Sequence, residues 1–330
     1  MTRMLVLGGT GFVGPFVVRQ LLDQGHEVTL FHRGRREPPL TSGARHVHGE
    51  FERLPEHLST LARDEPEVVI DVNPGRGKSG HGALHFAGLA LRGVVLTSMD
   101  VYRAMSVLWG VDDGSAQPMP VTEDAELRTA PSPDLGPDLD FDNLDVERAV
   151  VSHRQEFPVT ILRCPVIYGP YDTQRRLRHY VRRMADGRPA IILDSRLARL
   201  RLSRGYVENI AQAAATAAAD KRAAGRTYNV GEIDALTEAE WVRAVGREFG
   251  WTGELVVADI DVLPQRRSAV PDQDLVGDTS RIRHELGYAE LVPRAEGLRR
   301  AIEWEAAHQR DEASTDYAQE DAVLLRLSSG

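Results

Sequence analysis

Three glycines near the start of the chain, Gly8, Gly11 and Gly14, have the spacing of a phosphate-binding turn. They directly follow the apolar run Arg3–Leu7, which is suited to a buried parallel strand, and they open a helical stripe of apolar residues. Glycines at such a turn let the backbone approach a pyrophosphate, and the N-terminus of the next helix points its N–H groups at the ligand. The sequence therefore predicts a dinucleotide site at this turn, where the other expected contacts are Thr10, Phe12 and Val13.

Basic residues follow the second predicted strand, Glu27–Phe31, at the place where the adenosine ribose of a dinucleotide is recognised. An NAD site usually has an acid here, which binds the ribose 2′-hydroxyl, whereas a basic residue suits the 2′-phosphate of NADP. Arg33, Arg35 and Arg36 all precede the first acid, Glu37. We expect NADP as the cofactor, with Arg33 as the main contact. The alternative is a solvated arginine loop beside a site that takes NAD or no dinucleotide.

Further segments along the chain carry recognisable motifs: Leu96–Tyr102, Leu162–Pro170, Arg204–Ala211 and Asp278–Gly287. Together with the glycine turn, they resemble the extended short-chain dehydrogenase/reductases of the NAD-dependent epimerase/dehydratase type, and especially the atypical members of that family. The resemblance implies an epimerase, dehydratase or reductase that acts on a sugar nucleotide or another small polar molecule. It also implies that Glu50 and Phe51 lie beside the adenine of the cofactor.

The catalytic groups that this resemblance implies are only partly present. Ser98 matches the Ser or Thr that polarises the substrate oxygen. The family's Tyr-x-x-x-Lys pair is missing, because Phe141 and Asp145 stand at those two positions. A tyrosine needs a nearby cation to transfer protons near neutral pH, and the chain has only two lysines, Lys78 and Lys221, neither on the expected helix.

Three explanations for the missing pair remain open at the level of the sequence. The chain could run altered chemistry, with Tyr102, Asp142, Asp145 or Glu123 as the proton-transfer group. It could bind a dinucleotide without chemistry, as a sensor or scaffold. The alignment could also be shifted through the Pro-rich stretch, although no shift creates the missing lysine. Acidic residues at 142 and 145 would also suit a helix N-terminus for purely structural reasons.

Two positions are expected to border the substrate. Tyr168 begins a segment that lines the pocket in the proteins that the chain resembles, and Arg204 belongs to an arginine-rich region. Guanidinium groups bind diphosphates and carboxylates well, although much of this region could be a solvated helix face. A second Gly-rich loop, Asn73–Gly80, imitates a P-loop, but Val72 stands where the first glycine belongs. We expect Asn73 to lie near the cofactor, or its loop to be a mobile surface segment.

Two histidine pairs have spacings that metal sites also use. His46 and His48 share one face of a predicted strand, and His81 and His85 lie one helical turn apart. Neither pair has an evident third ligand in the sequence, and no His-Glu-x-x-His motif occurs. We therefore expect no metal site.

The elements that position these residues alternate between strands and helices, which predicts an α/β fold with a doubly wound, mostly parallel sheet. Residues 1–168, with 204–232 returning to it, are expected to form a Rossmann-type domain. Residues 169–203 and 233–308 are expected to form a smaller, mostly helical substrate-binding part, and 309–330 a flexible tail. A helix is also expected at 81–91.

Composition excludes several classes of protein. The chain has 330 residues, of which 42% are hydrophobic and 27% charged, so it is not a disordered chain. The net charge of −9 argues against nucleic-acid binding, and the single Cys164 excludes an internal disulfide framework. No apolar run suits a membrane span and no signal peptide opens the chain, so we expect a cytoplasmic protein without a membrane partner. A homodimer is possible on the resemblance alone.

Overall fold

A seven-stranded parallel sheet forms the centre of the molecule, and it confirms the predicted α/β, doubly wound fold. The computed structural model describes residues 1–72, 74, 82–131, 142–259, 272–308 and 315–328. The strands lie in the order β10-β6-β5-β4-β1-β2-β3. Their bounds are β1 Arg3–Leu7, β2 Glu27–His32, β3 Arg45–His48, β4 Val68–Asp71, β5 Arg92–Ser98, β6 Val159–Cys164 and β10 Thr227–Asn229. The strand order reverses between β1 and β4, and ligands of such sheets bind beyond the carboxyl ends at this point.

Helices cover both faces of this sheet because successive strand residues point to opposite sides. Met4 and Val6 of β1 pack with α1 (Gly14–Asp23) and α7 (Val207–Ala219), which lie side by side. Leu5 and Leu7 face the other side, toward α2 (Leu54–Ala62) and α4 (Asn143–Ser152). Buried alanines dominate α7, so this helix can approach α1 and the sheet closely.

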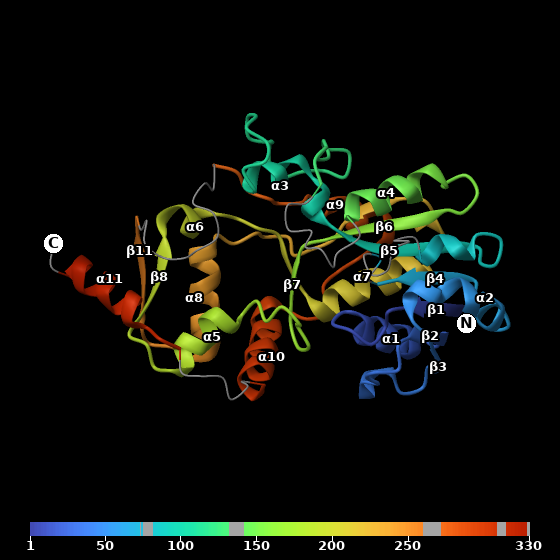
Figure 1. Cartoon of the computed structure of the whole chain (residues 1–330), viewed down its shortest axis with the longest axis horizontal. Helices are drawn as coiled ribbons and strands as arrows, with labels where there is room; N and C mark the ends of the chain where they lie inside the picture. Colours follow the sequence, from blue (N-terminus) through green and yellow to red (C-terminus); the bar gives the residue numbers. More distant parts are fainter. Residues whose placement is uncertain (73, 75–81, 132–141, 260–271, 309–314, 329–330) are drawn as a thin grey trace.

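The second part of the chain lies to the left of the seven-stranded sheet in Figure 1. Its two-stranded parallel sheet joins β8 (Ala190–Asp194) to β11 (Glu254–Ala258). A second small sheet joins β7 (Val166–Tyr168) to β9 (Arg204–Tyr206), between the two parts. The remaining helices are α3 Arg103–Leu108, α5 Arg178–Ala185, α6 Ser195–Arg199, α8 Glu238–Phe249, α9 Ser280–Leu286, α10 Arg294–Ala307 and α11 Ala318–Ser328.

Two segments differ from the sequence-based expectation. The helix expected at 81–91 is only a short 3-10 turn over Gly82–Phe86 in the described residues, because Gly88 takes a left-handed conformation with φ of +79°. The tail expected to be flexible contains α11, which ion pairs fasten to the second part: Arg183 pairs with Glu320 and Arg188 with Asp321. None of the described helices is long and apolar enough to cross a membrane.

Candidate functional site

The glycine turn forms a tight cradle between β1 and α1. Gly8 has a φ of +80°, which favours glycine. A Cβ at Gly14 would lie 2.4 Å from the Cα of Gly9, so this glycine is needed for close packing of helix against turn. At Gly11, by contrast, the nearest atom to an added Cβ is the carbonyl oxygen of Gly8 at 3.9 Å. The space above Gly11 is therefore open, as a site for a pyrophosphate requires.

The amino end of α1 is also suited to an anion. Val13 is its N-cap residue and makes no side-chain hydrogen bond to the first turn. Thr10, Phe12 and Val13 are partly exposed beside the exposed Gly11. The positive end of the α1 dipole thus lies at the open side of the glycine turn, and no acidic side chain caps it or lies in the first turn.

The residues expected at the adenosine end gather beyond the carboxyl ends of β2 and β3. Arg33 is exposed, and its side chain makes no ion pair or hydrogen bond with the other described residues. Arg35 lies 3.4 Å from a carboxylate oxygen of Glu50. The Phe51 ring packs on Phe31 with a centroid separation of 6.2 Å. Asn73 and most of its Gly-rich loop lie outside the described residues.

Ser98 is the last residue of β5, so it lies at the carboxyl ends of the strands, as the glycine turn does. Its Oγ accepts a hydrogen bond of 3.1 Å from the backbone N–H of Asp100, so the hydroxyl proton can be donated to another oxygen. Asp100 was not singled out by the sequence, although it lies within the recognised segment Leu96–Tyr102. Its carboxylate accepts hydrogen bonds of 3.1 and 3.3 Å from the side chain of Asn143, and it lies 3.9 Å from the guanidinium of Arg128.

Burial raises the pKa of Asp100 to about 6, against the opposing effects of Arg128 and Asn143. A carboxyl group that changes charge in this range can take up or release a proton near neutral pH. The Asp100 side chain is still 24% exposed, so solvent reaches it. Among the described residues near Ser98, Asp100 is therefore the group best suited to proton transfer.

Tyr102 occupies a buried network under the same edge of the sheet. Its hydroxyl donates to Asn229 at 2.6 Å and accepts from Arg163 at 2.9 Å. The side chain is fully buried, which raises its pKa to about 12 even though Arg163 opposes the shift. The backbone N–H of Asn229 donates to Glu123, whose carboxylate also pairs with Arg281. These contacts give Tyr102 and Glu123 structural roles and favour neither as the proton-transfer group.

The two acids predicted on the catalytic helix point in different directions. Asp142 is buried and forms a bidentate ion pair with Arg128, and it also caps α4 by accepting from the backbone N–H of Leu144 at 2.9 Å. Asp145 points to solvent and pairs with Arg148 at 3.3 Å. The structure thus brings Asp142, but not Asp145, to the region of Asp100. Phe141 lies outside the described residues.

The inner face of α4 carries Asn143 and Glu147, one helical turn apart. Asn143 contacts Asp100, and Glu147 forms a buried ion pair of 2.7 Å with Arg163 of β6. The hydroxyl of Thr97 on β5 also donates to Glu147 at 2.8 Å. The Glu147 carboxylate and the Arg163 guanidinium therefore occupy the inner face of α4. The spacing of four residues between Asn143 and Glu147 could have indicated from the sequence that both lie on one face of the helix.

The two positions expected at the substrate are buried in the small sheet between the two parts, Tyr168 on β7 and Arg204 on β9. The Tyr168 hydroxyl donates to Glu232 at 2.8 Å, and its ring packs against Trp241. Arg204 pairs with Glu238 and stacks over Trp241, with 4.3 Å between its guanidinium carbon and the ring centroid. Both side chains thus pack the small sheet against α8, and their contact with a substrate stays a prediction.

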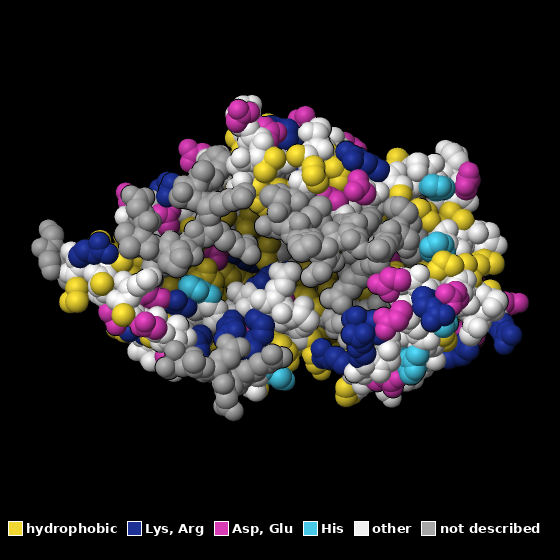
Figure 2. Space-filling model, viewed as in Figure 1, with side chains coloured by type: hydrophobic (Ala, Val, Ile, Leu, Met, Phe, Trp, Pro, Cys, Tyr) yellow, Lys and Arg dark blue, Asp and Glu magenta, His cyan; other side chains and the backbone are white. Residues whose placement is uncertain are grey.

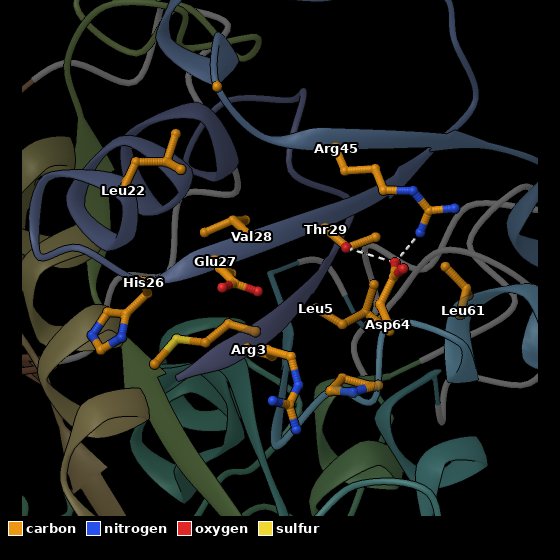
Figure 3. A pocket seen from close by; sticks show the side chains of 13 residues that line it. Arg3, Leu5, Leu22, His26, Glu27, Val28, Thr29, Arg45, Leu61 and Asp64 are labelled. Atoms are coloured by element: carbon orange, nitrogen blue, oxygen red, sulfur yellow. Dashed lines mark hydrogen bonds and ion pairs between the residues drawn. The ribbon is translucent and has the colours of Figure 1, made fainter. Parts of the chain in front are cut away.

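A cavity of about 360 Å³ lies at the other end of the sheet. Arg3 and Glu27, the first residues of β1 and β2, line it together with Arg45 and Asp64. Figure 3 shows Asp64 reached by both Thr29, at 2.8 Å, and Arg45. The glycine turn follows the carboxyl end of β1, so this cavity is separate from the candidate cofactor crevice.

Comparisons with known proteins agree with this geometry. The model of the NAD dependent epimerase/dehydratase family matches residues 4–93 and 143–231, and it leaves out 94–142, which holds Ser98 and Asp100. The UDP-glucose 4-epimerase of Thermotoga maritima, solved with UDP-glucose, has a TM-score of 0.70 at 17% identity and covers 93% of this chain and 100% of its own. The UDP-glucose-4-epimerase of Stenotrophomonas maltophila, solved with NAD and formylated UDP-arabinopyranose, has a TM-score of 0.70 at 16% identity, with coverages of 94% and 100%.

A curated relative carries a different name. The chloroplast stem-loop binding protein of 41 kDa b from Arabidopsis thaliana is 21% identical over 341 residues, which cover 98% of this chain and 84% of that protein.

Proposed function

The chain belongs to the NAD-dependent epimerase/dehydratase family, and from this premise we propose that it is an enzyme that uses NADP(H) for epimerase, dehydratase or reductase chemistry. The observation that carries the proposal is the open glycine cradle beside a serine hydroxyl and a carboxyl group of raised pKa at the same edge of the sheet. Sugar nucleotides are the proposed substrates, because the structural neighbours named above were solved with UDP-sugars. A cytoplasmic location and a homodimer stay predictions.

The cofactor would lie with its pyrophosphate over Gly11 and its adenosine toward Glu50 and Phe51. Arg33 is the proposed partner of a 2′-phosphate, because it is exposed next to the carboxyl end of β2. A bound nicotinamide would supply hydride transfer, which is the chemistry that the protein's own side chains lack.

The proposed proton chemistry uses Ser98 and Asp100. The Ser98 hydroxyl would donate a hydrogen bond to the reacting oxygen of the substrate, since its Oγ already accepts from the Asp100 backbone. The Asp100 carboxylate would take a proton from the substrate, or its protonated form would return one. In this proposal Asp100 replaces the tyrosine that the family usually has, and Asn143 and Arg128 position its carboxyl group.

A non-catalytic dinucleotide-binding protein is the second candidate. It is favoured by α4, which carries no lysine and whose Glu147 is held in a buried ion pair with Arg163. Nucleic-acid binding, which the name of the Arabidopsis relative raises, is not our proposal. The chain has a net charge of −9, and on the right-hand side of Figure 2 basic side chains lie among acidic ones.

The test of the cofactor is a calorimetric titration of the full chain with NADPH and with NADH. We expect NADPH to bind at least about tenfold more tightly, because a guanidinium–phosphate contact contributes more than about 1.4 kcal/mol. Arg33→Ala should remove most of this preference, and Arg19→Ala should not, because Arg19 pairs with Asp23 at the far end of α1. Equal affinities in the wild-type protein would remove the argument for NADP, and tighter binding of NADH would reverse it.

The test of catalysis is turnover of a panel of UDP- and dTDP-sugars by the NADP-loaded protein, followed by product analysis. The proposed enzyme is supported if the wild-type protein turns over a sugar nucleotide, Asp100→Asn does not, and the exposed-site control Asp113→Asn still does. Tight cofactor binding without turnover of any member of the panel would favour the non-catalytic candidate.

A further inference from the structure

The fold assembles a group of metal-ligating side chains that the sequence shows only in part. His46 and His48 lie on β3, and the pairing of Leu30 with His46 and of His32 with His48 places His32 of β2 beside them. All three imidazoles lie on one face of the sheet, since strand residues two apart point the same way. Glu37, from the loop between the two strands, completes the group, which we call the histidine cluster.

The ligand atoms of the histidine cluster converge on one point. The Nε2 of His32 lies 2.9 Å from the Nδ1 of His46, and the Nε2 of His48 lies 2.9 Å from a carboxylate oxygen of Glu37. The same oxygen lies 3.6 Å from His46 Nδ1 and 4.0 Å from His32 Nε2. All four ligand atoms lie within 4.8 Å of one another. In a tetrahedral zinc site with bonds of about 2.0–2.1 Å, ligand atoms are about 3.3 Å apart, so small side-chain shifts are sufficient.

We propose that the histidine cluster binds one Zn²⁺ ion. Three imidazoles and one carboxylate are a donor set that zinc prefers, whereas Mg²⁺ and Ca²⁺ prefer oxygen ligands alone. Four protein ligands leave no open coordination position, so the ion would be structural. It would fasten the edge strand β3 and the loop at 33–44 to β2.

Charged groups of both signs lie in the loop that carries Glu37. Arg33, Arg35 and Arg36 lie in the same loop and oppose a cation, but all three are exposed, where solvent and salt screen their charge.

Metal binding would replace hydrogen bonds that the histidines make in the absence of the ion. The backbone N–H of Gly34 donates to His32 Nδ1 at 3.1 Å, so the neutral ring carries its proton on Nε2 and donates it to His46. Zinc binding through His32 Nε2 moves this proton to Nδ1 and breaks the contact with Gly34. His46 needs no such change, because its Nε2 lies 3.3 Å from the carbonyl of Thr41 and its Nδ1 already presents a lone pair.

The experiment uses the full chain without a histidine tag, stripped with a chelator and then titrated with ZnCl₂ in a calorimeter. We expect one Zn²⁺ per chain and a higher Tm for the zinc-loaded protein. The same protein titrated with Co²⁺ should give the strong visible absorption of a tetrahedral site. MgCl₂ should give no saturable binding.

The variants His48→Gln and Glu37→Gln remove exposed ligands, so both should fold. Both should bind Zn²⁺ at least tenfold more weakly, because the loss of even a residue that only hydrogen-bonds to a metal ligand lowers metal affinity by about tenfold or more. The control His153→Gln, at the exposed histidine that follows the last residue of α4, should bind Zn²⁺ like the wild-type protein. The proposal would be overturned if His153→Gln weakened Zn²⁺ binding as much as the two cluster variants do, or if neither cluster variant weakened it. The absence of binding to the stripped wild-type protein would also overturn it.

Discussion

Asp100 offers the sharpest test of the proposed proton chemistry, because its pKa links stability to pH. Folding raises the pKa of this carboxyl group from 3.8 to about 6 through burial. A shift of this size corresponds to about 3 kcal/mol of differential free energy. Since the side chain is 24% exposed, solvent screening reduces the expected effect to about 1–2 kcal/mol.

The sign of the effect follows from proton linkage. Between about pH 4 and pH 6 the folded protein binds this proton and the unfolded chain does not, so the contribution to stability is present below pH 4 and is lost as the pH rises through 6. In Asp100→Asn the residue no longer titrates. The stability of the wild-type protein should therefore fall by about 1–2 kcal/mol more than that of the variant over this pH range.

The assay is urea unfolding of both proteins at several values between pH 4 and pH 7, with the exposed-site variant Asp113→Asn as the control. The control should follow the wild-type curve. If Asp100→Asn and the wild-type protein show the same pH dependence, the raised pKa is refuted, and with it the argument that Asp100 exchanges protons near neutrality.

Two further predictions concern what holds the site in place. Arg163→Met leaves the buried carboxylate of Glu147 without its ion-pair partner and should lower the free energy of unfolding by about 3–5 kcal/mol. The double variant Arg163→Met, Glu147→Gln should recover much of that loss, and additive losses in urea unfolding would contradict this pairing. Thr237→Ala removes the capping box of α8, in which the threonine hydroxyl accepts from the N–H of Glu240, and should cost about 1 kcal/mol, while an unchanged Tm would contradict the assigned cap.

The elements that the sequence predicts well are those with a strong local signal. The pattern of apolar residues in the sequence predicts helices over Val207–Ala219 and Glu238–Phe249, and these are the bounds of α7 and α8 in the structure. The pairs β7–β9 and β8–β11 are harder to predict. They join segments far apart in the chain, such as Val166 with Arg204, and their strands are short.

The same distinction applies to the site. The glycine turn is local in sequence, and it lies where the pattern predicts it, between β1 and α1. The surroundings of Asp100 are not local, since Asn143 and Arg128 come from other segments. Likewise, the pairing of Tyr102 with Asn229 spans 127 residues, so the spacing of residues along the chain gives no sign of it. Chemistry that depends on such pairings needs the fold.

NADPH binding at the glycine cradle is the decisive property of the proposed cofactor site. In Gly11→Ala the new methyl group lies 3.9 Å from the nearest protein atom, so the variant should keep the wild-type Tm while its Cβ fills space that a pyrophosphate needs. The decisive measurement is a calorimetric titration of NADPH into wild-type protein and Gly11→Ala. We expect one NADPH to bind per wild-type chain, and we expect an affinity at least about tenfold weaker in the variant. Equal affinities in the two proteins, or no binding of NADPH or NADH to the wild-type protein, would contradict the proposed site.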